Sequence, residues 1–146
     1  MGQSLSDPEP IVTEIIDAAV KLHRKLGPGL LESVYKTSLC ADLVLRGLSV
    51  QREVPVLLIL DGRKLGKSFS VDLLVNAAVV VEVKAIKRLA PVHFRQISTY
   101  LKLLELPIGL LMNFGGATLK QGLHRIVNGY VPTPSSPLRI NKMRHR

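Results

Sequence analysis

Apolar residues recur at intervals of three and four along the first third of the chain, a spacing that predicts two amphipathic helices. The first covers residues 11–26, with proline near its start and a Gly-Pro-Gly sequence just after its end. The second covers residues 30–46, and Gly47 stands where a left-handed residue commonly ends a helix. Four apolar side chains, among others, are expected to face the core from this second helix: Leu31, Val34, Leu39 and Leu43.

From residue 50 onward the pattern changes to that of strands, with short runs of Val, Ile and Leu between turn signals. Asp61-Gly62 predicts a tight hairpin turn after the first run, and Asn76-Ala77 is the expected turn between the next two. Pro91 suits the first turn of a third helix, and Pro107 would stop that helix. The expected elements are strands over 50–60, 69–75 and 78–84, a helix over 91–106, and strands over 108–114 and 123–128.

This order of elements predicts an α/β protein of the α+β type. Three hairpin-linked strands followed by a helical crossover to a fourth imply a central mixed β-sheet flanked by helices. A chain of 146 residues has the size of one domain, which we expect to cover residues 1–131. Residues 132–146 contain four of the 20 Lys and Arg and no acid, so we expect a flexible basic tail there.

Composition narrows the classes of function. No apolar run approaches the roughly 20 residues that a membrane-spanning helix needs, and the first ten residues lack a secretory pattern. We therefore expect a cytoplasmic protein with no membrane partner. The lone Cys40 cannot form an internal disulfide, and no Cys or His cluster has zinc-ligand spacing, so a bound metal would have oxygen ligands. The net charge of +9 favours a polyanionic partner such as nucleic acid.

Acidic residues stand inside two of the apolar strands, where burial of a carboxylate is costly unless it is compensated. Asp72 is out of phase with the apolar positions around it, while Glu82 and Lys84 share one face of the next strand. If these faces coincide, two carboxylates and an ammonium converge, and carboxylates are ligands that Mg²⁺ or Mn²⁺ prefers. The residues alone leave an alternative open: Glu82 and Lys84 form a salt bridge, and Asp72 marks an edge.

Two helices carry further candidate residues. Glu32 and Tyr35 are three apart, just after the Gly-Pro-Gly sequence, and Gln96 and Tyr100 are four apart beside an apolar helix face. Taken alone, the first pair is more typical of an acid near a helix N-terminus with a half-buried tyrosine. The second pair is typical of hydrogen-bonded residues at the edge of a core. Neither pair by itself indicates a site.

In their order and spacing, however, these residues closely resemble the GxxExxY protein family, which belongs to the PD-(D/E)XK nuclease superfamily. The likeness runs from about residue 11 to residue 127. Val71, rather than proline, precedes Asp72, at a position that varies in the superfamily. The motifs that carry the resemblance are Gly29-x-x-Glu32-x-x-Tyr35, Asp72-Leu73-Leu74-Val75, Glu82-Val83-Lys84, Gln96-x-x-x-Tyr100 and Asn113-Phe114-Gly115.

The resemblance implies a restriction-endonuclease-like core with the metal site at its middle strands. It implies that Asp72, Glu82 and the carbonyl of Val83 are metal ligands and that Lys84 is the catalytic lysine. The implied reaction is hydrolysis of phosphodiester bonds, in DNA, by a water activated by Mg²⁺, with Mn²⁺ as a substitute ion.

The resemblance also gives roles to the helical candidates. Glu32 corresponds to an acid that often completes such sites, through a water or at a second ion. Gln96 and Tyr100 correspond to a helix motif that lies beside the site and touches substrate or ligands. The alternative function is a non-catalytic nucleic-acid-binding or partner-regulating module that keeps the nuclease fold. A homodimer would give so small a domain a second copy with which to grip a duplex.

Overall fold

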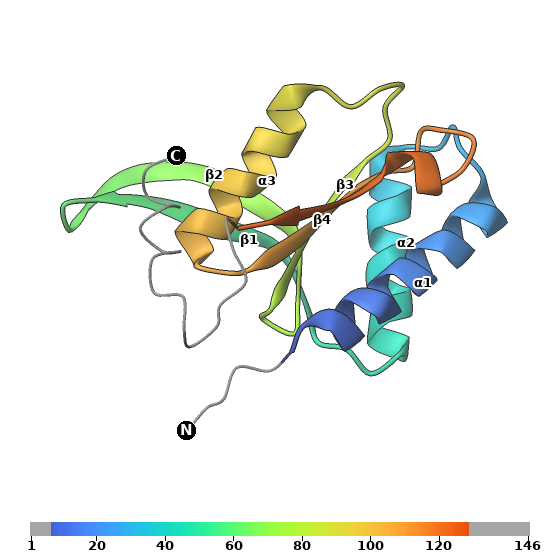
Figure 1. Ribbon diagram of the computed structural model, residues 1–146, viewed down its shortest axis with the longest axis horizontal. Helices are drawn as coiled ribbons and strands as arrows, with labels where there is room; N and C mark the ends of the chain where they lie inside the picture. The colour runs from blue at the N-terminus through green and yellow to red at the C-terminus, as the bar shows by residue number, and fades with distance from the viewer. Residues whose placement is uncertain (1–6, 129–146) are drawn as a thin grey trace.

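The expected fold class is confirmed by the computed structural model, which describes residues 7–128 apart from the side chains of 66–68 (Figure 1). Five strands form one sheet in the order β1-β2-β3-β4-β5. β3 and β4 run parallel, and the other neighbouring pairs are antiparallel. The predicted tail at 132–146 lies outside the described residues. The elements are α1 (Glu9–Leu26), α2 (Glu32–Leu45), β1 (Val50–Leu60), β2 (Arg63–Val75), β3 (Val79–Lys84), α3 (Pro91–Leu104), β4 (Ile108–Asn113), the 3₁₀ turn η1 (Lys120–Gly122) and β5 (Leu123–Val127).

Helices cover both faces of the sheet, with α1 and α2 on one side and α3 on the other (Figure 1). β3 shows the division most clearly, because Val79, Val81 and Val83 pack in the cluster with α1 and α2, whereas Val80 packs with α3. The prediction of a central strand covered on both faces is therefore confirmed. Within the described residues, no helix combines the length and the apolar character needed to cross a membrane.

The burial predicted for the second helix is half wrong. Leu39 and Leu43 are buried as expected, but Leu31 is 75% exposed and Val34 is 39% exposed. The fully buried Tyr35 takes the position one turn before Leu39, so the core stripe of α2 runs through residues spaced by four. Leu31 precedes the helix in an extended conformation and leaves this stripe, while Val34 faces solvent beside it.

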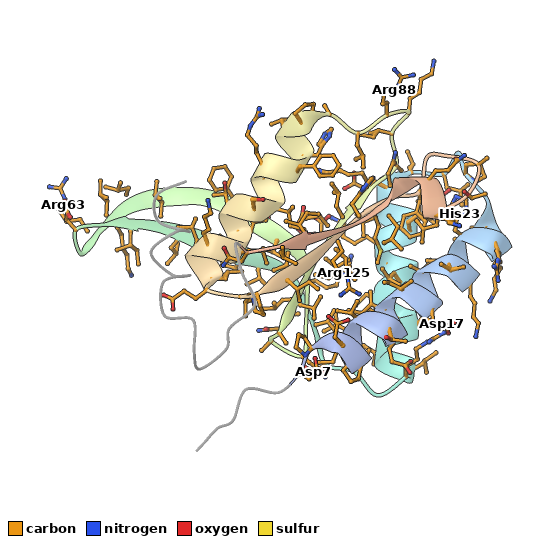
Figure 2. All side chains as sticks on the ribbon, in the orientation of Figure 1. Asp7, Asp17, His23, Arg63, Arg88 and Arg125 are labelled. Atoms are coloured by element: carbon orange, nitrogen blue, oxygen red, sulfur yellow. The ribbon has the colours of Figure 1, made fainter. Side chains whose placement is uncertain are left out.

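β1 and β2 together form a long hairpin whose outer part projects from the body as a two-stranded arm (Figure 1). Asp61 and Gly62 have φ values of 52° and 77°, as expected for a two-residue turn with two left-handed positions. β2 begins at Arg63, six residues earlier than predicted, because the pairing with β1 continues to this turn; Arg63 marks the far end of the arm (Figure 2).

β2 separates from β3 after only three residue pairs. The two strands pair from Leu73 with Val81 to Val75 with Val79, whereas β3 and β4 pair along six residues. From Asp72 in β2 and Glu82 in β3 the two strands diverge, and we call this point the fork. A fork removes ladder hydrogen bonds from the backbone groups on its inner sides, and other polar groups must replace them.

Candidate active site at the β2–β3 fork

Asp72 and Glu82 lie side by side at the fork and replace the missing ladder bonds with their own carboxylates. The N–H of Asp72 donates to Oε2 of Glu82, and the N–H of Val83 donates to Oδ2 of Asp72, each at 2.8 Å. Asp72 is 9% exposed and Glu82 is 3% exposed. The structure therefore brings the two predicted acids together, with the backbone of Val83 beside them.

Burial, together with the nearby charge of Asp72, raises the pKa of Glu82 to about 8. Burial is the largest cause, followed by the charge of Asp72, whereas the hydrogen bond from Asp72 N–H and the charges of Lys84 and Lys36 lower this pKa. Both causes that raise it penalise negative charge. A cation placed between the two acids would stabilise their charged forms, which is the property that a divalent metal site requires.

Lys84 shares the strand face of Glu82, but the salt bridge left open by the sequence is absent. Glu82 accepts instead from the backbone N–H of Asp72, and Lys84 acts on it only through its charge, which lowers the pKa of Glu82. Asp72 does not mark an edge either, since β2 lies between β1 and β3. Lys84 is half-buried at the end of β3, and its carbonyl accepts from Phe114 N–H at 2.8 Å.

Lys36 is one of two residues of this site that the sequence analysis missed; the other is Glu53. Lys36 extends from α2, and its Nζ lies 3.1 Å from Oδ1 of Asp72, 2.9 Å from Oε2 of Glu53 and 3.9 Å from Oε2 of Glu32. Burial disfavours the charged ammonium, but the hydrogen bonds and charges of Glu53 and Asp72 outweigh it and raise the pKa of Lys36. Lys36 therefore joins acids from three elements.

The sequence did contain signals for the two residues missed. Lys36 stands four positions after Glu32, so the two share a face of α2. Glu53 is the one acid within β1. Its φ of 49° is unusual for a residue other than glycine, and it falls at a gap in the ladder between β1 and β2, opposite Asp72.

Glu32 is held at the first turn of α2 by the tyrosine three residues later. The Tyr35 hydroxyl donates to the carbonyl of Gly27 and accepts from the N–H of Leu30, which closes the turn before the helix. Its ring stacks on Phe114 with centroids 4.6 Å apart. Gly29 has a φ of 98° in this turn, so the glycine and the tyrosine of Gly29-x-x-Glu32-x-x-Tyr35 both shape it. Glu32 reaches the site through Lys36.

Tyr100 and Gln96 approach the acids from α3, on the other side of the fork. Tyr100 is 2% exposed, and its pKa is raised to about 12, first by burial and then by the charges of Glu82 and Asp72. A hydrogen bond with Gln96 acts in the opposite direction. Gln96 therefore adjoins the acids through Tyr100, so the structure brings both predicted α3 residues to the site.

The residues at the fork suit a hard divalent cation, although they are few. Within residues 7–128, no three Asp, Glu, His or Cys side chains gather as a ready metal-binding group. Asp72 and Glu82 stand together, while Glu32 and Glu53 lie around Lys36. Two carboxylates supplemented by backbone oxygen and water are typical of Mg²⁺ sites in proteins. The donor set therefore fits Mg²⁺ with Asp72 and Glu82 as its protein carboxylates.

Asn113-Phe114-Gly115 fastens the loop that follows Lys84. The Asn113 side chain accepts from Ile86 N–H at 2.9 Å and donates to the Ile86 carbonyl at 2.9 Å. Gly115 is required because a Cβ there would lie 2.0 Å from the carbonyl oxygen of Ile86. Lys84 is therefore held between a regular strand and an anchored loop.

Residues 9–126 match the family described as the PD-(D/E)XK nuclease superfamily. No curated protein and no solved structure matches the chain significantly. The matched segment includes all five strands up to Ile126 and every candidate residue at the fork. Both the acid pair followed by lysine and the extent of the match lead to the same conclusion: the chain belongs to the PD-(D/E)XK nuclease superfamily.

Proposed function

We propose that this protein is a Mg²⁺-dependent nuclease of the GxxExxY family that acts in the cytoplasm and hydrolyses phosphodiester bonds in DNA. The observation that carries the proposal is the buried pair of Asp72 and Glu82, with Lys84 on the same strand face as Glu82. Membership of the nuclease superfamily supports a nucleic-acid substrate. The charge of +9 is favourable for binding a polyanion.

Asp72, Glu82 and the carbonyl of Val83 would hold the Mg²⁺ or Mn²⁺ ion, and Glu32 would act through a water or at a second ion. The ion would supply a water of lowered pKa and stabilise negative charge on the phosphate. Lys84, as a point cation, would orient the attacking water and stabilise the charge that develops on the phosphate oxygens.

The residues around the acids have positioning roles in this proposal. Tyr100, with its raised pKa, stays a neutral hydroxyl, and Gln96 orients it by a hydrogen bond. In the absence of metal, Lys36 neutralises Asp72. Binding of an ion beside Asp72 would weaken this ion pair, so Lys36 would be free to approach the substrate phosphate.

One observation favours a second candidate function, a non-catalytic module that binds nucleic acid or regulates a partner. Asp72 and Glu82 both satisfy backbone N–H groups that the fork leaves without ladder partners, so they have a structural role even without a metal. In such a module the acids would serve the fork alone.

Cleavage assays on the purified full chain separate the two functions. With Mg²⁺ or Mn²⁺ we expect cleavage of DNA, and we expect Glu82→Ala or Lys84→Ala to abolish it while nucleic-acid binding and folding are largely kept. Lys102→Ala, on the exposed side of α3, is the matched control for the lost cation. If neither single- nor double-stranded DNA or RNA is cut with either ion, the nuclease proposal is wrong.

We also propose a homodimer formed through the arm of the β1–β2 hairpin. The arm exposes six large apolar side chains, each between 38% and 58% exposed: Leu57, Leu58, Ile59, Leu60, Leu65 and Phe69. β1 is an edge strand, and no charged residue stands between 54 and 60, so the strand that would pair with a second copy is uncharged over this length.

A second copy is the occupant that fits this arm. Two edge strands can pair antiparallel about a two-fold axis, so that the same apolar surface meets itself. A standard interface buries roughly 800 Å² per partner, and the six exposed apolar side chains and the strand edge would both contribute to it. Pro55 lacks an N–H, so the pairing would lie beyond it, toward the tip.

A further inference from the structure

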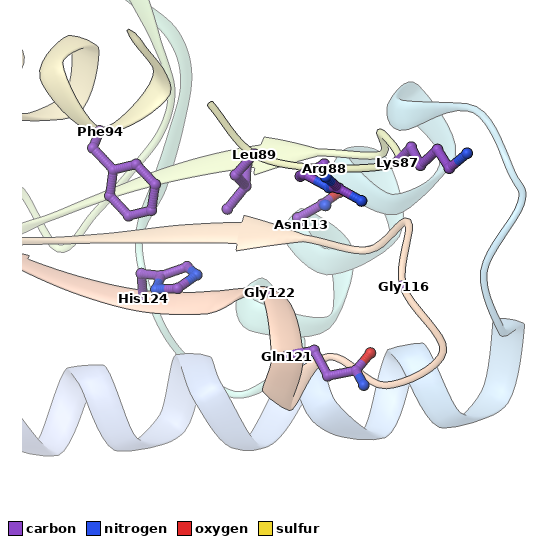
Figure 3. A pocket seen from close by; sticks show the side chains of 9 residues that line it. All are labelled: Lys87, Arg88, Leu89, Phe94, Asn113, Gly116, Gln121, Gly122 and His124. Atoms are coloured by element: carbon purple, nitrogen blue, oxygen red, sulfur yellow. The ribbon is translucent and has the colours of Figure 1, made fainter. Parts of the chain in front are cut away.

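A cavity of about 340 Å³ adjoins the candidate active site on the α3 face of the sheet (Figure 3). Its wall includes Asn113, which lies beside Lys84 in the parallel register of β3 and β4. Neighbouring strands are about 4.8 Å apart, so the cavity begins one strand away from the proposed catalytic lysine. Its volume falls within the range of about 300–1,000 Å³ that is usual for small-molecule sites.

One end of the cavity is aromatic and apolar. Phe94 of α3 and His124 of β5 meet edge to face, with ring centroids 5.0 Å apart and planes at 73°, and Leu89 lies near them (Figure 3). All three are half-buried, so part of each side chain faces the opening. A wall of this kind suits a flat, uncharged group such as a nucleobase, which stacks or packs on aromatic side chains regardless of sequence.

The rim of the cavity is basic. Lys87 and Arg88 are exposed, and Arg88 extends outward from the loop between β3 and α3 (Figure 2). Neither belongs to any ion pair among the described residues. Their charges are therefore available to an anion, and a phosphate is the anion that a nucleic-acid strand would present.

The loop that carries these cations is fixed before any ligand arrives. Asn113 binds both the N–H and the carbonyl of Ile86, and Gly115 packs directly against the Ile86 carbonyl. Because Ile86 directly precedes the two cations, the anchor holds the basic rim at a set distance from both Lys84 and the aromatic wall. Such preorganisation lowers the entropy cost of binding.

We propose that this cavity receives one unpaired nucleotide of the strand whose phosphodiester lies at the fork, with its base against Phe94 and His124 and its phosphate at Lys87 and Arg88. The inference rests on the proposed nuclease function and deepens it. A base inside a duplex is covered by its stacked neighbours, so only an unpaired or extruded nucleotide can enter. The substrate is therefore DNA in which the nucleotide next to the cleaved bond is unpaired or extruded.

Binding of a mononucleotide to the metal-free full chain tests the cavity without requiring cleavage. The protein is titrated with dAMP, and binding is followed by the NMR chemical shifts of its backbone amides. We expect the shifts of residues around Phe94, Arg88 and His124 to change. Inorganic phosphate should bind at least tenfold more weakly, and deoxyadenosine likewise. If dAMP perturbs only other parts of the protein, or if phosphate alone binds as tightly as dAMP, the proposal is overturned.

Two variants locate the contacts. The double variant Lys87→Ala/Arg88→Ala changes only exposed side chains, and we expect it to weaken dAMP binding at least tenfold relative to Lys102→Ala. Phe94→Leu keeps apolar volume and removes the ring, and it should weaken dAMP binding at least threefold while leaving phosphate binding unchanged. Equal dAMP affinity in all variants would overturn the assignment. Because metal is absent, dAMP binding without nuclease activity would contradict the proposed function alone.

Discussion

The inner and outer halves of β2 depart from ordinary burial in opposite directions. In the inner half, Asp72 is a carboxylate with 9% exposure, inside a run of buried apolar side chains. In the outer half, Phe69 is 44% exposed, and across the hairpin Ile59 of β1 is 53% exposed. Both departures cost free energy, since water favours the carboxylate and disfavours the apolar groups.

This difference indicates which kind of partner each half of the strand would bind. Of the two buried acids, Asp72 pairs with Lys36, whereas Glu82 accepts from a backbone N–H and has no ion pair among the described residues. The exposed apolar residues of the arm have no such compensation for their contact with water. The inner half lies between two helical layers, so a small ion would complete it. The outer half is a two-stranded ribbon, which is marginally stable alone, so a protein surface would complete it.

The largest expected effect is on DNA cleavage, which should depend on the inner half of β2 and not on its outer half. Asp72→Asn removes the charge of one proposed metal ligand but keeps an oxygen that can accept from Val83 N–H. We expect cleavage in Mg²⁺ to fall by about 10³-fold or more, because charge stabilisation at the phosphate is lost. Leu65→Thr, in the outer half of the same strand, is the control and should change cleavage less than threefold. Equal losses in the two variants would contradict the assignment of the site to the fork.

Stability without metal should respond next most strongly. Glu82→Gln keeps an acceptor for Asp72 N–H and removes the charge, so we expect the metal-free protein to gain about 2–4 kcal/mol in free energy of unfolding near pH 8. The sign follows from the raised pKa of Glu82: the unfolded group ionises near its ordinary 4.5 and the folded group at about 8.

The pH dependence of that gain is the sharper measurement. Below pH 4.5, the ordinary pKa of the group, wild type and Glu82→Gln should have similar free energies of unfolding. As the pH rises toward 8, wild type should become less stable than Glu82→Gln. Urea unfolding at several pH values, in excess chelator, measures the difference. Glu14→Gln, at an exposed acid, is the control and should show no such trend. A loss of stability in Glu82→Gln at pH 8 would indicate that the acid has a purely structural role.

Lys36→Met should have a smaller effect in the opposite direction. The substitution leaves Asp72 without its cation, and we expect a loss of about 1–3 kcal/mol in metal-free stability, between the values for exposed and buried ion pairs. Added Mg²⁺ should recover part of this loss and stabilise the variant more than wild type. Lys21→Met, which breaks an exposed pair with Asp17, is the control. Thermal unfolding with and without Mg²⁺ measures both, and equal losses would contradict the role given to Lys36.

The convergence of the acids could be predicted from the sequence, whereas their partners could not. Alternation along β2 and β3 and the family motifs placed Asp72 and Glu82 on adjacent strands. The fork itself depends on where β2 leaves β3, which no local pattern records, so the residues alone left a salt bridge with Lys84 open. Lys36 and Glu53 reach Asp72 from α2 and β1 through tertiary packing, which spacing within one element cannot reveal.

The exposure of the apolar residues in the arm could not be predicted from the sequence either. Strand propensity and the Asp61-Gly62 turn predicted a hairpin, and that hairpin is present. Propensity does not tell how far a hairpin extends past its neighbouring strands, and beyond the fork β2 has lost contact with β3. Residues such as Leu58 and Leu60, which any hydropathy pattern assigns to a core, therefore remain in solvent.

The smallest expected effect on stability is that of a substitution in the arm. Such a substitution can therefore test the proposed dimer without unfolding the individual copies. Ile59→Lys replaces a side chain that is 53% exposed, so the fold of each copy should change by only about 0.5 kcal/mol. A lysine on both copies would place like charges in the shared apolar surface, and we expect the wild-type dimer to become a monomer in sedimentation velocity runs. Lys64→Glu, at the charged tip of the arm, is the control and should leave the dimer intact. A wild-type chain that sediments as a monomer would contradict the proposed homodimer.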